Sequence, residues 1–180
     1  FDVRDKGNLK KLIKNFRPTI IFHLAAQPII SDSYKKPKET IMVNAIGTLN
    51  ILDICKDYKF IKSIICITSD KCYQNNFSTK GFKEDDKLGG SDPYSASKAC
   101  AEIIAKSYLD SFYLRNNIGL ATGRAGNVIG GGDWSPNRLI PDCIKSIKKN
   151  KTIYLRRPNF NRPWQHVLEP LYGYLLLALK

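Results

Sequence analysis

The sequence predicts an α/β protein built on a parallel sheet, and three observations lead to this fold class. Two short, nearly continuous apolar runs rich in isoleucine, residues 19–24 and 63–68, are typical of strands buried on both faces. Between and after these runs, apolar residues recur at three- and four-residue spacing, which is the pattern of amphipathic helices. Strand and helix therefore alternate along the chain, and this alternation favours parallel strands joined by helical crossovers.

The remaining elements of this part follow from the same patterns. Helices are expected at residues 8–16, 37–56 and 93–111, and a weaker third strand is expected at residues 118–122. The helix at residue 93 has the clearest start, because Asp92 is a favourable N-cap and Pro93 suits the first helical position. The polar, turn-rich segment from residue 73 to 92 is longer than an ordinary connection and indicates a functional loop.

After Gly130-Gly-Gly132 the pattern changes and indicates a second, incomplete domain. We expect a helix at residues 139–150, a short strand at 152–155 and a helix at 169–180. No internal repeat or long low-complexity tract interrupts the chain.

Composition narrows the class of protein. With 43% hydrophobic and 25% charged residues in 180, the chain has the make-up of a soluble globular protein rather than a disordered one. Its apolar stretch near the C-terminus is far shorter than the roughly 20 residues that span a bilayer. The first residues lack a start methionine and the features of a signal peptide, so we expect the sequence to begin within a longer protein.

Cysteine, histidine and charge exclude several kinds of site. The five cysteines are odd in number and never form a C-x-x-C pair, which argues against a disulfide framework and a zinc site and predicts a reducing, cytoplasmic setting. The two histidines offer no metal-ligand spacing, so no metal is expected. The net charge of +13 is compatible with nucleic-acid binding, with attraction of small polyanions or with a lysine-rich surface. Because the lysines are scattered along predicted helices, the surface interpretation is favoured.

Tyr94-Ser-Ala-Ser-Lys98 is the strongest local signal of chemistry. A spacing of four on a helix places the phenol and the ammonium on one face. Tyrosine alone is a poor base at neutral pH, and a neighbouring cation favours its phenolate. The same spacing also arises on ordinary exposed helix faces, so the pattern needs its context.

That context is Thr68-Ser-Asp-Lys71, which directly follows the second predicted strand. Open parallel sheets bind ligands at the carboxyl ends of their strands, so the segments after Leu24, Thr68 and Thr122 are expected to face a cleft. The alternative is an ordinary strand-ending turn, for which Ser and Asp are favoured residues.

Several motifs together resemble the extended short-chain dehydrogenases/reductases. They are Phe22-His-Leu-Ala-Ala-Gln27, Asn44-Ala-Ile-Gly-Thr48, Thr68-Ser-Asp-Lys71, Tyr94-Ser-Ala-Ser-Lys98 and Arg124-Ala-Gly-Asn-Val128, in the family's order. The resemblance covers essentially the whole chain. It implies that residues 1–128 form a partial, NAD-binding Rossmann-type domain that lacks its first βαβ unit, and that residues 129–180 begin a truncated substrate-binding domain for a nucleotide sugar.

The resemblance also implies roles for individual residues. Catalytic roles would fall to Asn44, Ser69, Asp70, Lys71, Tyr94 and Lys98. Contacts with NAD would fall to Asp2, Val3, Leu24, Ala25, Ala26, Gln27, Thr68, Tyr94 and Lys98. The nucleotide sugar would contact Asn127, Arg138, Leu139 and Arg162. An arginine fork suits a diphosphate well. Two alternatives remain open: Asn44 as a purely structural hydrogen-bonding residue and Arg162 in a surface turn. His166 is expected to be structural.

Within the family, the sequences of these motifs are most similar to those of members that dehydrate CDP-glucose to a CDP-4-keto-6-deoxyglucose through transient reduction of NAD. In that reaction Tyr94 would take the proton of the 4-hydroxyl and Asp70 would protonate the departing 6-hydroxyl. Lys71 would be the candidate base for the C5 proton. The resemblance further implies a homodimer, no nucleic-acid or membrane partner, and a place in deoxysugar biosynthesis such as that of lipopolysaccharide O-antigen.

Other classes of function remain. An epimerase or reductase of the same family needs the Tyr-Lys pair but not Asp70 and Lys71. A nucleotide-binding protein without turnover would keep the fold alone, and a basic nucleic-acid protein is a remote further alternative. The sequence contains no G-x-G-x-x-G turn after a first strand, and Gly130-Gly-Gly132 lacks that spacing. We therefore expect the chain as given to bind NAD poorly and not to turn over.

Overall fold

The computed structural model describes residues 2–75, 80–156 and 158–180. Residues 76–79 of the polar loop predicted at 73–92 thus lie outside the described part. The chain divides into two compact units. The first holds the residues up to Ala125 together with Gly173–Lys180, and the second is Gly126–Tyr172.

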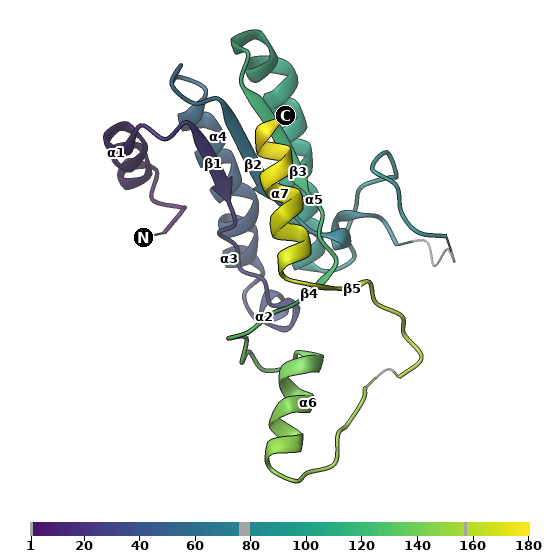
Figure 1. The fold of residues 1–180 in the computed structure, drawn as a ribbon. Coiled ribbons are helices and arrows are strands. Elements are labelled where there is room, and N and C mark those ends of the chain that lie inside the picture. The colour runs from purple at the N-terminus through teal and green to yellow at the C-terminus, as the bar shows by residue number, and fades with distance from the viewer. Residues whose placement is uncertain (1, 76–79, 157) are drawn as a thin grey trace. The chain divides into compact units, whose positions relative to one another are not determined.

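The first unit contains a parallel sheet of three strands, β1 (Ile20–His23), β2 (Ser63–Ile67) and β3 (Gly119–Gly123) (Figure 1). Its helices are α1 (Lys6–Phe16), α2 (Ile30–Lys35), α3 (Pro37–Ile41), α4 (Gly47–Cys55) and α5 (Pro93–Tyr108). Shorter helical turns are η1 (Met42–Ile46), η2 (Asp70–Cys72), η3 (Leu109–Tyr113) and η4 (Leu114–Asn116). The strand order is β1-β2-β3, with Ile20 beside Ser63 and Ser63 beside Gly119. The predicted α/β class with a parallel sheet is confirmed.

The three strands end at the same edge of the sheet because they are parallel and in register. The central strand β2 is buried along nearly its whole length, as its isoleucine-rich sequence predicts. The same prediction is wrong for β1, whose Ile20 and Phe22 are 38% and 37% exposed. Successive strand residues point to opposite faces, so Ile21 and His23 turn toward the helices while their neighbours do not.

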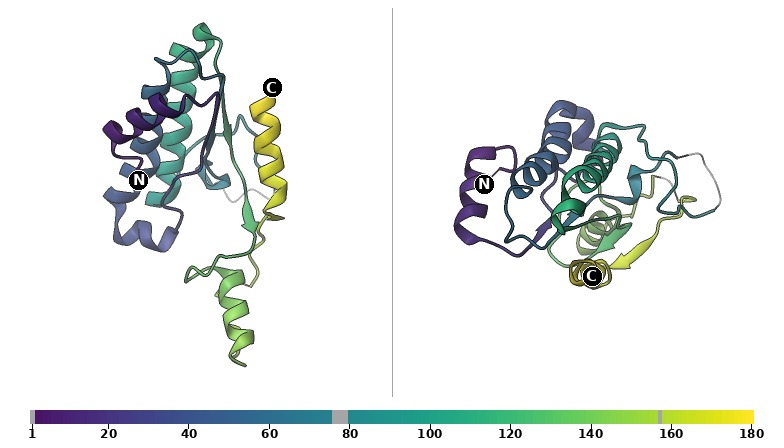
Figure 2. Two further views of the ribbon diagram at one scale, coloured as in Figure 1. Left: turned by 60° about the vertical axis from the view of Figure 1, so that its left-hand side comes forward. Right: turned by 90° about the horizontal axis from the view of Figure 1, so that it is seen from above.

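Helices cover the face that carries the main core (Figure 2). Leu52 of α4, Ile64 of β2 and Tyr113 of η3 are fully buried there. The Tyr113 hydroxyl donates to the Leu52 carbonyl at 2.6 Å, so the one polar atom of this large ring is satisfied. On the other face of the sheet, the Tyr174 ring at the end of the chain lies against Gly123 of β3, where an added Cβ would be 2.8 Å from it.

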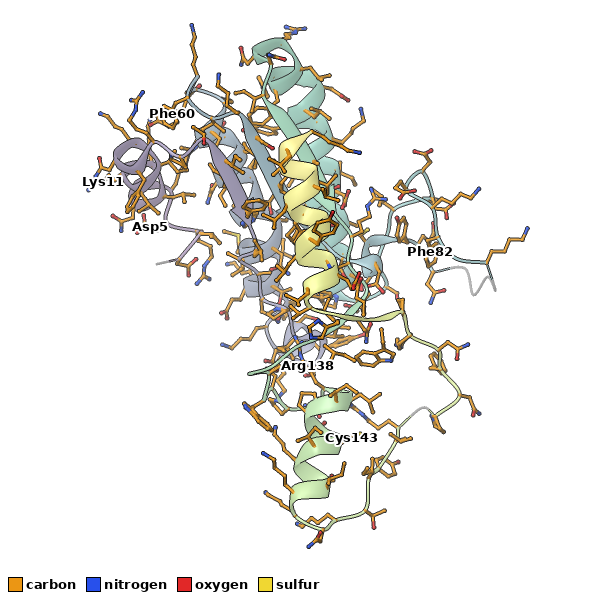
Figure 3. The ribbon with its side chains drawn as sticks, viewed as in Figure 1. Asp5, Lys11, Phe60, Phe82, Arg138 and Cys143 are labelled. Carbon is orange, nitrogen blue, oxygen red and sulfur yellow. The ribbon has the colours of Figure 1, made fainter. Side chains whose placement is uncertain are left out.

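Helix boundaries follow capping residues and differ in detail from the sequence pattern. Helix α1 begins at Lys6, two residues before its predicted start, because the Asp5 carboxylate accepts a hydrogen bond from Asn8 N at 3.0 Å (Figure 3). The helix predicted at residues 37–56 is not uniform: the π-helical turn η1 separates α3 from α4. The helix predicted at 93–111 ends its α-helical part at Tyr108 and continues through η3.

The second unit contains two short parallel strands, β4 (Asn127–Ile129) and β5 (Trp164–His166), and helix α6 (Leu139–Lys148). Helix α7 (Leu168–Leu179) begins in this unit and ends in the first. The strand predicted at residues 152–155 is wrong, since that segment has no regular structure and Tyr154 is 84% exposed. A strand needs a partner for its backbone hydrogen bonds, and a short apolar run does not reveal whether one is present.

Within the described residues, no helix combines the length and the apolar character needed to cross a membrane.

A first prediction concerns His23, which is 5% exposed and hydrogen-bonds through Nε2 with Thr48 Oγ1 at 3.0 Å. Burial, helped by the nearby Lys98 cation, lowers the pKa of His23 from 6.5 to about 4. Between these values the unfolded chain binds a proton that the folded chain does not, so stability falls as the pH drops from about 6.5 to about 4. The loss should reach ~3 kcal/mol in the free energy of unfolding.

Urea unfolding of the full-length protein between neutral pH and pH 5 tests this. The His23→Gln variant should show a clearly shallower dependence than wild type. His166, the other histidine, is exposed, and His166→Gln serves as the matched control that keeps the wild-type dependence. An unchanged dependence in His23→Gln would contradict the assignment.

Candidate active site

The first turns of α5 hold two chemically active side chains, Tyr94 and Lys98, near the carboxyl end of β2. The Asp92 carboxylate caps the helix by accepting from Ser95 N at 3.0 Å, and Pro93 occupies the first turn, as predicted. Tyr94 and Lys98 then follow on one face and are only 8% and 5% exposed. The sequence alone did not show whether the helix face with Tyr94 and Lys98 is exposed, and in the structure this face is buried.

Gly90 fixes the loop that leads into this helix. A Cβ at Gly90 would lie 2.3 Å from Ala96 N and 2.6 Å from Ser95 Cβ, so a side chain has no space there. Glycine thus lets the backbone of the loop approach the first turn of α5 closely.

Lys98 is held directly at the end of β2. Its ammonium Nζ donates to the carbonyl of Ile67, the last residue of that strand, at 3.0 Å. Burial lowers the pKa of Lys98 to about 8, and interactions with Cys66, Glu102 and Cys72 partly oppose that effect. A buried ammonium beside a tyrosine favours the phenolate form of the ring, which is what a proton-accepting tyrosine requires.

Ser69, Asp70 and Lys71 form one hydrogen-bonded group just after β2. Asp70 Oδ1 accepts from Ser69 Oγ at 3.0 Å and from Lys71 Nζ at 2.9 Å. Ser69 Oγ in turn accepts from Lys71 N at 3.2 Å, which closes the turn η2. The side chains of Asp70 and Lys71 are 26% and 30% exposed, so solvent or a ligand can reach them.

Helix α5 packs against η2, so the group at the end of β2 and the Tyr94-Lys98 pair belong to one site in the first unit. Asp70 N also donates to the Ala125 carbonyl at 3.1 Å, which ties η2 to the segment after β3. The structure therefore brings together side chains that the sequence separates by more than twenty positions.

Asn44 lies in the π-helical turn η1 and is 1% exposed. Its carboxamide accepts from Gln27 N at 2.8 Å, donates to Gln27 O at 3.1 Å and donates to Ser97 Oγ at 2.9 Å. Both amide protons and the oxygen are thus engaged by protein atoms. This geometry favours the structural interpretation: Asn44 fastens the segment after β1 to α5, and a direct catalytic role stays a prediction.

The segment after β1 presents backbone to the same edge. Leu24 is 52% exposed, and Ala25 is exposed as well. Gln27 is anchored by its contacts with Asn44 and by Nε2, which donates to Thr40 Oγ1 at 3.1 Å. The segment is therefore held at its far end while its first residues stay accessible.

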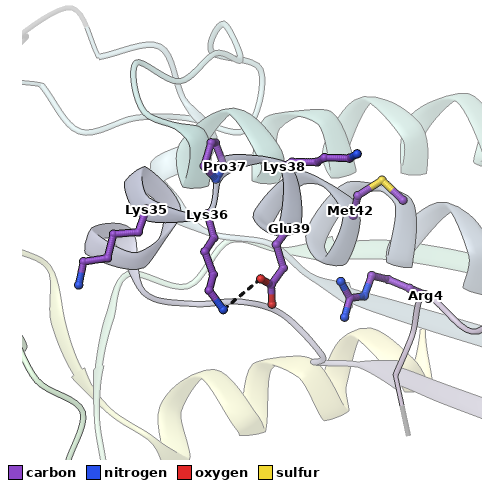
Figure 4. Close-up of a pocket in the computed structure, with 7 residues that line it drawn as sticks. All are labelled: Arg4, Lys35, Lys36, Pro37, Lys38, Glu39 and Met42. Atoms are coloured by element: carbon purple, nitrogen blue, oxygen red, sulfur yellow. Dashed lines mark ion pairs between the residues drawn. The ribbon is translucent and has the colours of Figure 1, made fainter.

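Val3 lies beside α4, and Arg4, the partner of Asp2, lines an open depression of about 440 Å³ (Figure 4). Val3 is held by Asn50 Nδ2, which donates to its carbonyl at 3.1 Å, and an added Cβ on Gly47 would be 2.6 Å from Val3 Cγ2. The Arg4 guanidinium binds the Asp2 carboxylate and keeps the pKa of Asp2 at about 2. The residues that line the depression are Arg4, Lys35, Lys36, Pro37, Lys38, Glu39 and Met42. Arg4 is paired with Asp2 and Lys36 with Glu39, so the net positive charge of the depression comes from Lys35 and Lys38.

The predicted substrate residues lie in the second unit. Asn127 begins β4 and Arg162 lies two residues before β5, and Asn127 N donates to Pro163 O at 2.9 Å. The pairing of the two strands thus brings these two residues to one end of the small sheet. Arg138 and Leu139 lie at the start of α6, where Arg138 binds Asp133 at 3.1 Å. His166 is exposed and its Nδ1 accepts from Leu168 N at 3.3 Å, and its structural role stays a prediction.

Glu102 and Thr122 belong to the site region, and the sequence interpretation assigned them no role. The Glu102 carboxylate accepts from Thr68 Oγ1, from Thr122 Oγ1 at 2.9 Å and from Arg124 NH2 at 2.7 Å. A signal was present, because Glu102 follows Lys98 by one helical turn, as Lys98 follows Tyr94.

The described residues fit the nicotinamide-ribose end of NAD. The Lys98 ammonium has three N–H donors, and the hydrogen bond to Ile67 uses one of them, which leaves capacity for ribose hydroxyls. The accessible backbone of Leu24 and Ala25 lies at the carboxyl end of β1, where such folds bind their cofactor. In the part of the chain that the structure describes, no cluster of three or more His, Cys, Asp or Glu side chains could hold a metal ion.

Comparison with known proteins gives a consistent result. The family described as GDP-mannose 4,6 dehydratase matches residues 1–178. The CDP-glucose 4,6-dehydratase of Salmonella typhimurium is 48% identical over 182 residues, which cover 98% of this chain and 51% of that protein. The dTDP-D-glucose 4,6-dehydratase of Dictyostelium discoideum is 31% identical over 160 residues, covering 83% of this chain and 36% of that protein.

Solved structures show the same fold. A UDP-N-acetylglucosamine 4-epimerase from Methanobrevibacter ruminantium, in complex with UDP-N-acetylmuramic acid, has a TM-score of 0.86 and 28% identity, covering all of this chain and 56% of its own. The dTDP-glucose 4,6-dehydratase of Bacillus anthracis, in complex with NAD, has a TM-score of 0.84 and 26% identity, covering all of this chain and 54% of its own. The chain therefore spans about half the length of the proteins it matches.

Proposed function

Since the chain belongs to the GDP-mannose 4,6-dehydratase family of the extended short-chain dehydrogenases/reductases, we propose that the full-length protein dehydrates a nucleotide-linked glucose, with CDP-glucose as its substrate. The product would be CDP-4-keto-6-deoxyglucose. The resemblance inferred from the motifs is confirmed at the level of the family, and the similarity to the Salmonella enzyme supports the choice of reaction.

One observation carries the proposal: the buried Tyr94-Lys98 pair and the Ser69-Asp70-Lys71 group meet at the end of β2. The first pair suits removal of a hydroxyl proton during oxidation of a sugar carbon. The second supplies an acid and a base for the loss of water. An epimerase or reductase would need only the first pair.

Bound NAD would supply a reversible hydride acceptor for C4 and C6 of the glucose, so the overall reaction would involve no net oxidation. Tyr94 would accept the proton of the 4-hydroxyl, and Lys98 would hold the nicotinamide ribose while stabilising the phenolate. Leu24, Ala25, Ala26, Gln27 and Thr68 would line the cofactor beside them. Asp2 and Val3 would contact its adenine end.

Asp70 and Lys71 hold the right number of protons for elimination. Their ion pair, 2.9 Å from Lys71 Nζ to Asp70 Oδ1, carries one transferable proton. Transfer of that proton from the ammonium to the carboxylate yields a neutral amine and a carboxylic acid. These are the base that removes the C5 proton and the acid that protonates the 6-hydroxyl as it leaves. The dehydration step therefore needs no proton from outside the pair.

The diphosphate of the substrate would contact Asn127 and Arg162, and its nucleoside would lie beside Arg138 and Leu139. The place of Asn127 and Arg162 at one end of the β4-β5 pair supports this assignment. We further propose a homodimer in a reducing cytoplasm, in keeping with five free cysteines among the described residues. The deoxysugar product would suit the biosynthesis of surface polysaccharides such as O-antigen.

The test is direct. The full-length protein is incubated with CDP-, dTDP-, UDP- and GDP-glucose in turn, and the products are analysed by mass spectrometry. Loss of one water from CDP-glucose, faster than from the other three, is the expected result. An unchanged mass with an altered sugar indicates epimerisation, and an intact sugar in every case contradicts an enzymatic role.

A further inference from the structure

Glu102 is a carboxylate buried at the meeting point of α5, β2 and β3. It is 4% exposed, and its three hydrogen-bond donors come from the ends of two strands: Thr68 after β2, and Thr122 and Arg124 at the end of β3. A buried carboxylate is costly unless it is paired and hydrogen-bonded, and here both oxygens are satisfied. Three hydrogen-bond donors around one buried carboxylate indicate a specific role for its negative charge.

Arg124 extends the contact of Glu102 to the polar loop. Its NH1 donates to the Tyr73 hydroxyl at 2.9 Å and to the Glu84 carbonyl at 2.7 Å. The guanidinium also lies 5.0 Å from the centre of the Tyr73 ring, which stacks on Phe82 at 4.8 Å (Figure 3). Burial is shared unequally in the ion pair, since the side chain of Arg124 is 18% exposed and that of Glu102 only 4%.

Glu102 and Lys98 bind consecutive residues of the same strand end. The Lys98 ammonium donates to the carbonyl of Ile67, and Glu102 accepts from the hydroxyl of Thr68. The two side chains are one helical turn apart on one face of α5, and the Glu102 carboxylate interacts electrostatically with the Lys98 ammonium.

We propose that Glu102 is a positioning residue of the redox centre, which holds the ends of β2 and β3 against α5 and keeps the Lys98 ammonium charged beside Tyr94. The inference rests on the proposed function, because it concerns the same Tyr94-Lys98 pair.

Ionisable groups from several elements interact electrostatically with Lys98. They are Glu102 on α5, His23 on β1, Cys66 on β2 and Cys72 in η2. Burial raises the pKa values of Cys66 and Cys72 to about 12, and the pKa of His23 is about 4, so these three are neutral near pH 7. The pKa of Lys98 is lowered to about 8 by burial, and Cys66, Glu102 and Cys72 oppose this, in that order. Glu102 is thus the carboxylate that offsets the burial of the ammonium.

The experiment measures the pH dependence of kcat/KM for CDP-glucose in the full-length protein loaded with NAD. If Lys98 must be charged, activity falls at high pH as Lys98 loses its proton. Glu102→Gln keeps the size of the side chain but removes its charge. The fall of kcat/KM at high pH, the basic limb of the profile, should therefore move down by about one pH unit, which is a tenfold lower proton affinity of Lys98. Glu102→Asp keeps the charge, and its basic limb should stay at the wild-type position although kcat falls.

Arg124→Gln is the matched variant, because it removes a positive charge next to Glu102 where Glu102→Gln removes a negative one. It removes the countercharge and leaves the carboxylate, so the basic limb should move up. A merely structural role predicts that both Glu102→Gln and Arg124→Gln lower kcat with no opposite movement of the limb, and that result would overturn the proposal. If Glu102→Gln fails to fold, Arg124→Gln decides alone, because an unmoved or lowered limb contradicts the inference.

Titration of Lys98 separates this inference from the proposed function. The protein is labelled with carbon-13 at lysine, and the NMR signal of Lys98 is assigned by its loss in Lys98→Met. The pH titration of this signal should move down in Glu102→Gln and up in Arg124→Gln, and it is measured without any turnover. If wild type does not convert CDP-glucose but the Lys98 titration moves as expected, the proposed function fails and the role of Glu102 stands. If wild type is active and the titration does not move, only the role of Glu102 is refuted.

Discussion

Tyr94→Phe should abolish nearly all turnover of CDP-glucose in the full-length protein, with kcat lower by about 10²- to 10⁴-fold. The substitution removes only the hydroxyl, and with it the group proposed to accept the proton when C4 is oxidised. The ring is 8% exposed and stays in its place on α5, so folding should be preserved. Single-turnover experiments should show no transient reduction of NAD, because the first step is the one that fails.

Tyr108→Phe is the matched control on the same helix. The Tyr108 hydroxyl donates to Asp53 at 3.2 Å, away from the end of β2. This variant should retain turnover within about twofold of wild type, as expected for loss of a partly exposed hydrogen bond. Equal losses in the two variants, or an active Tyr94→Phe enzyme, would show that Tyr94 is not the acceptor.

Lys71→Met should stop the reaction one step later. Removal of the amine leaves oxidation at C4 intact, so NAD should be reduced in a single turnover and then remain reduced. Release of deuterium from C5-labelled CDP-glucose should slow by about 10²-fold or more, the usual contribution of a general base. The cost to folding should be small, because the Asp70-Lys71 pair is about a quarter to a third exposed.

Lys87→Met supplies the control for Lys71, since Lys87 is an exposed lysine of the polar loop that follows η2. It should release deuterium at the wild-type rate. Unchanged release in Lys71→Met would remove Lys71 from the mechanism and direct attention to another base. The two largest predicted effects are thus distinguished by whether NAD is reduced before the reaction stops.

Local patterns were enough to predict most of the first unit. The isoleucine-rich runs became β1 and β2, and the Asp92-Pro93 start of α5 was correct. These features depend on neighbours within about one helical turn, so they can be read in one dimension. The motif Tyr94-Ser-Ala-Ser-Lys98 is equally local.

Errors arose where a feature depends on a distant partner. No strand forms at residues 152–155, while β4 and β5 form because Asn127 and Trp164 meet across 37 positions in sequence. The exposure of Ile20 and Phe22 likewise depends on what covers each face of the sheet and not on their own apolar character.

The sequence by itself determined the α/β class and the family, and it singled out the candidate site residues. The tertiary structure alone decided how those residues are arranged: that the Tyr94-Lys98 face is buried, that Asn44 is engaged by Gln27 and Ser97, and that Glu102 joins the ends of two strands. The physical reason is that burial and charge pairing are properties of neighbours in space. Parallel strands bring those neighbours together from segments far apart in the chain.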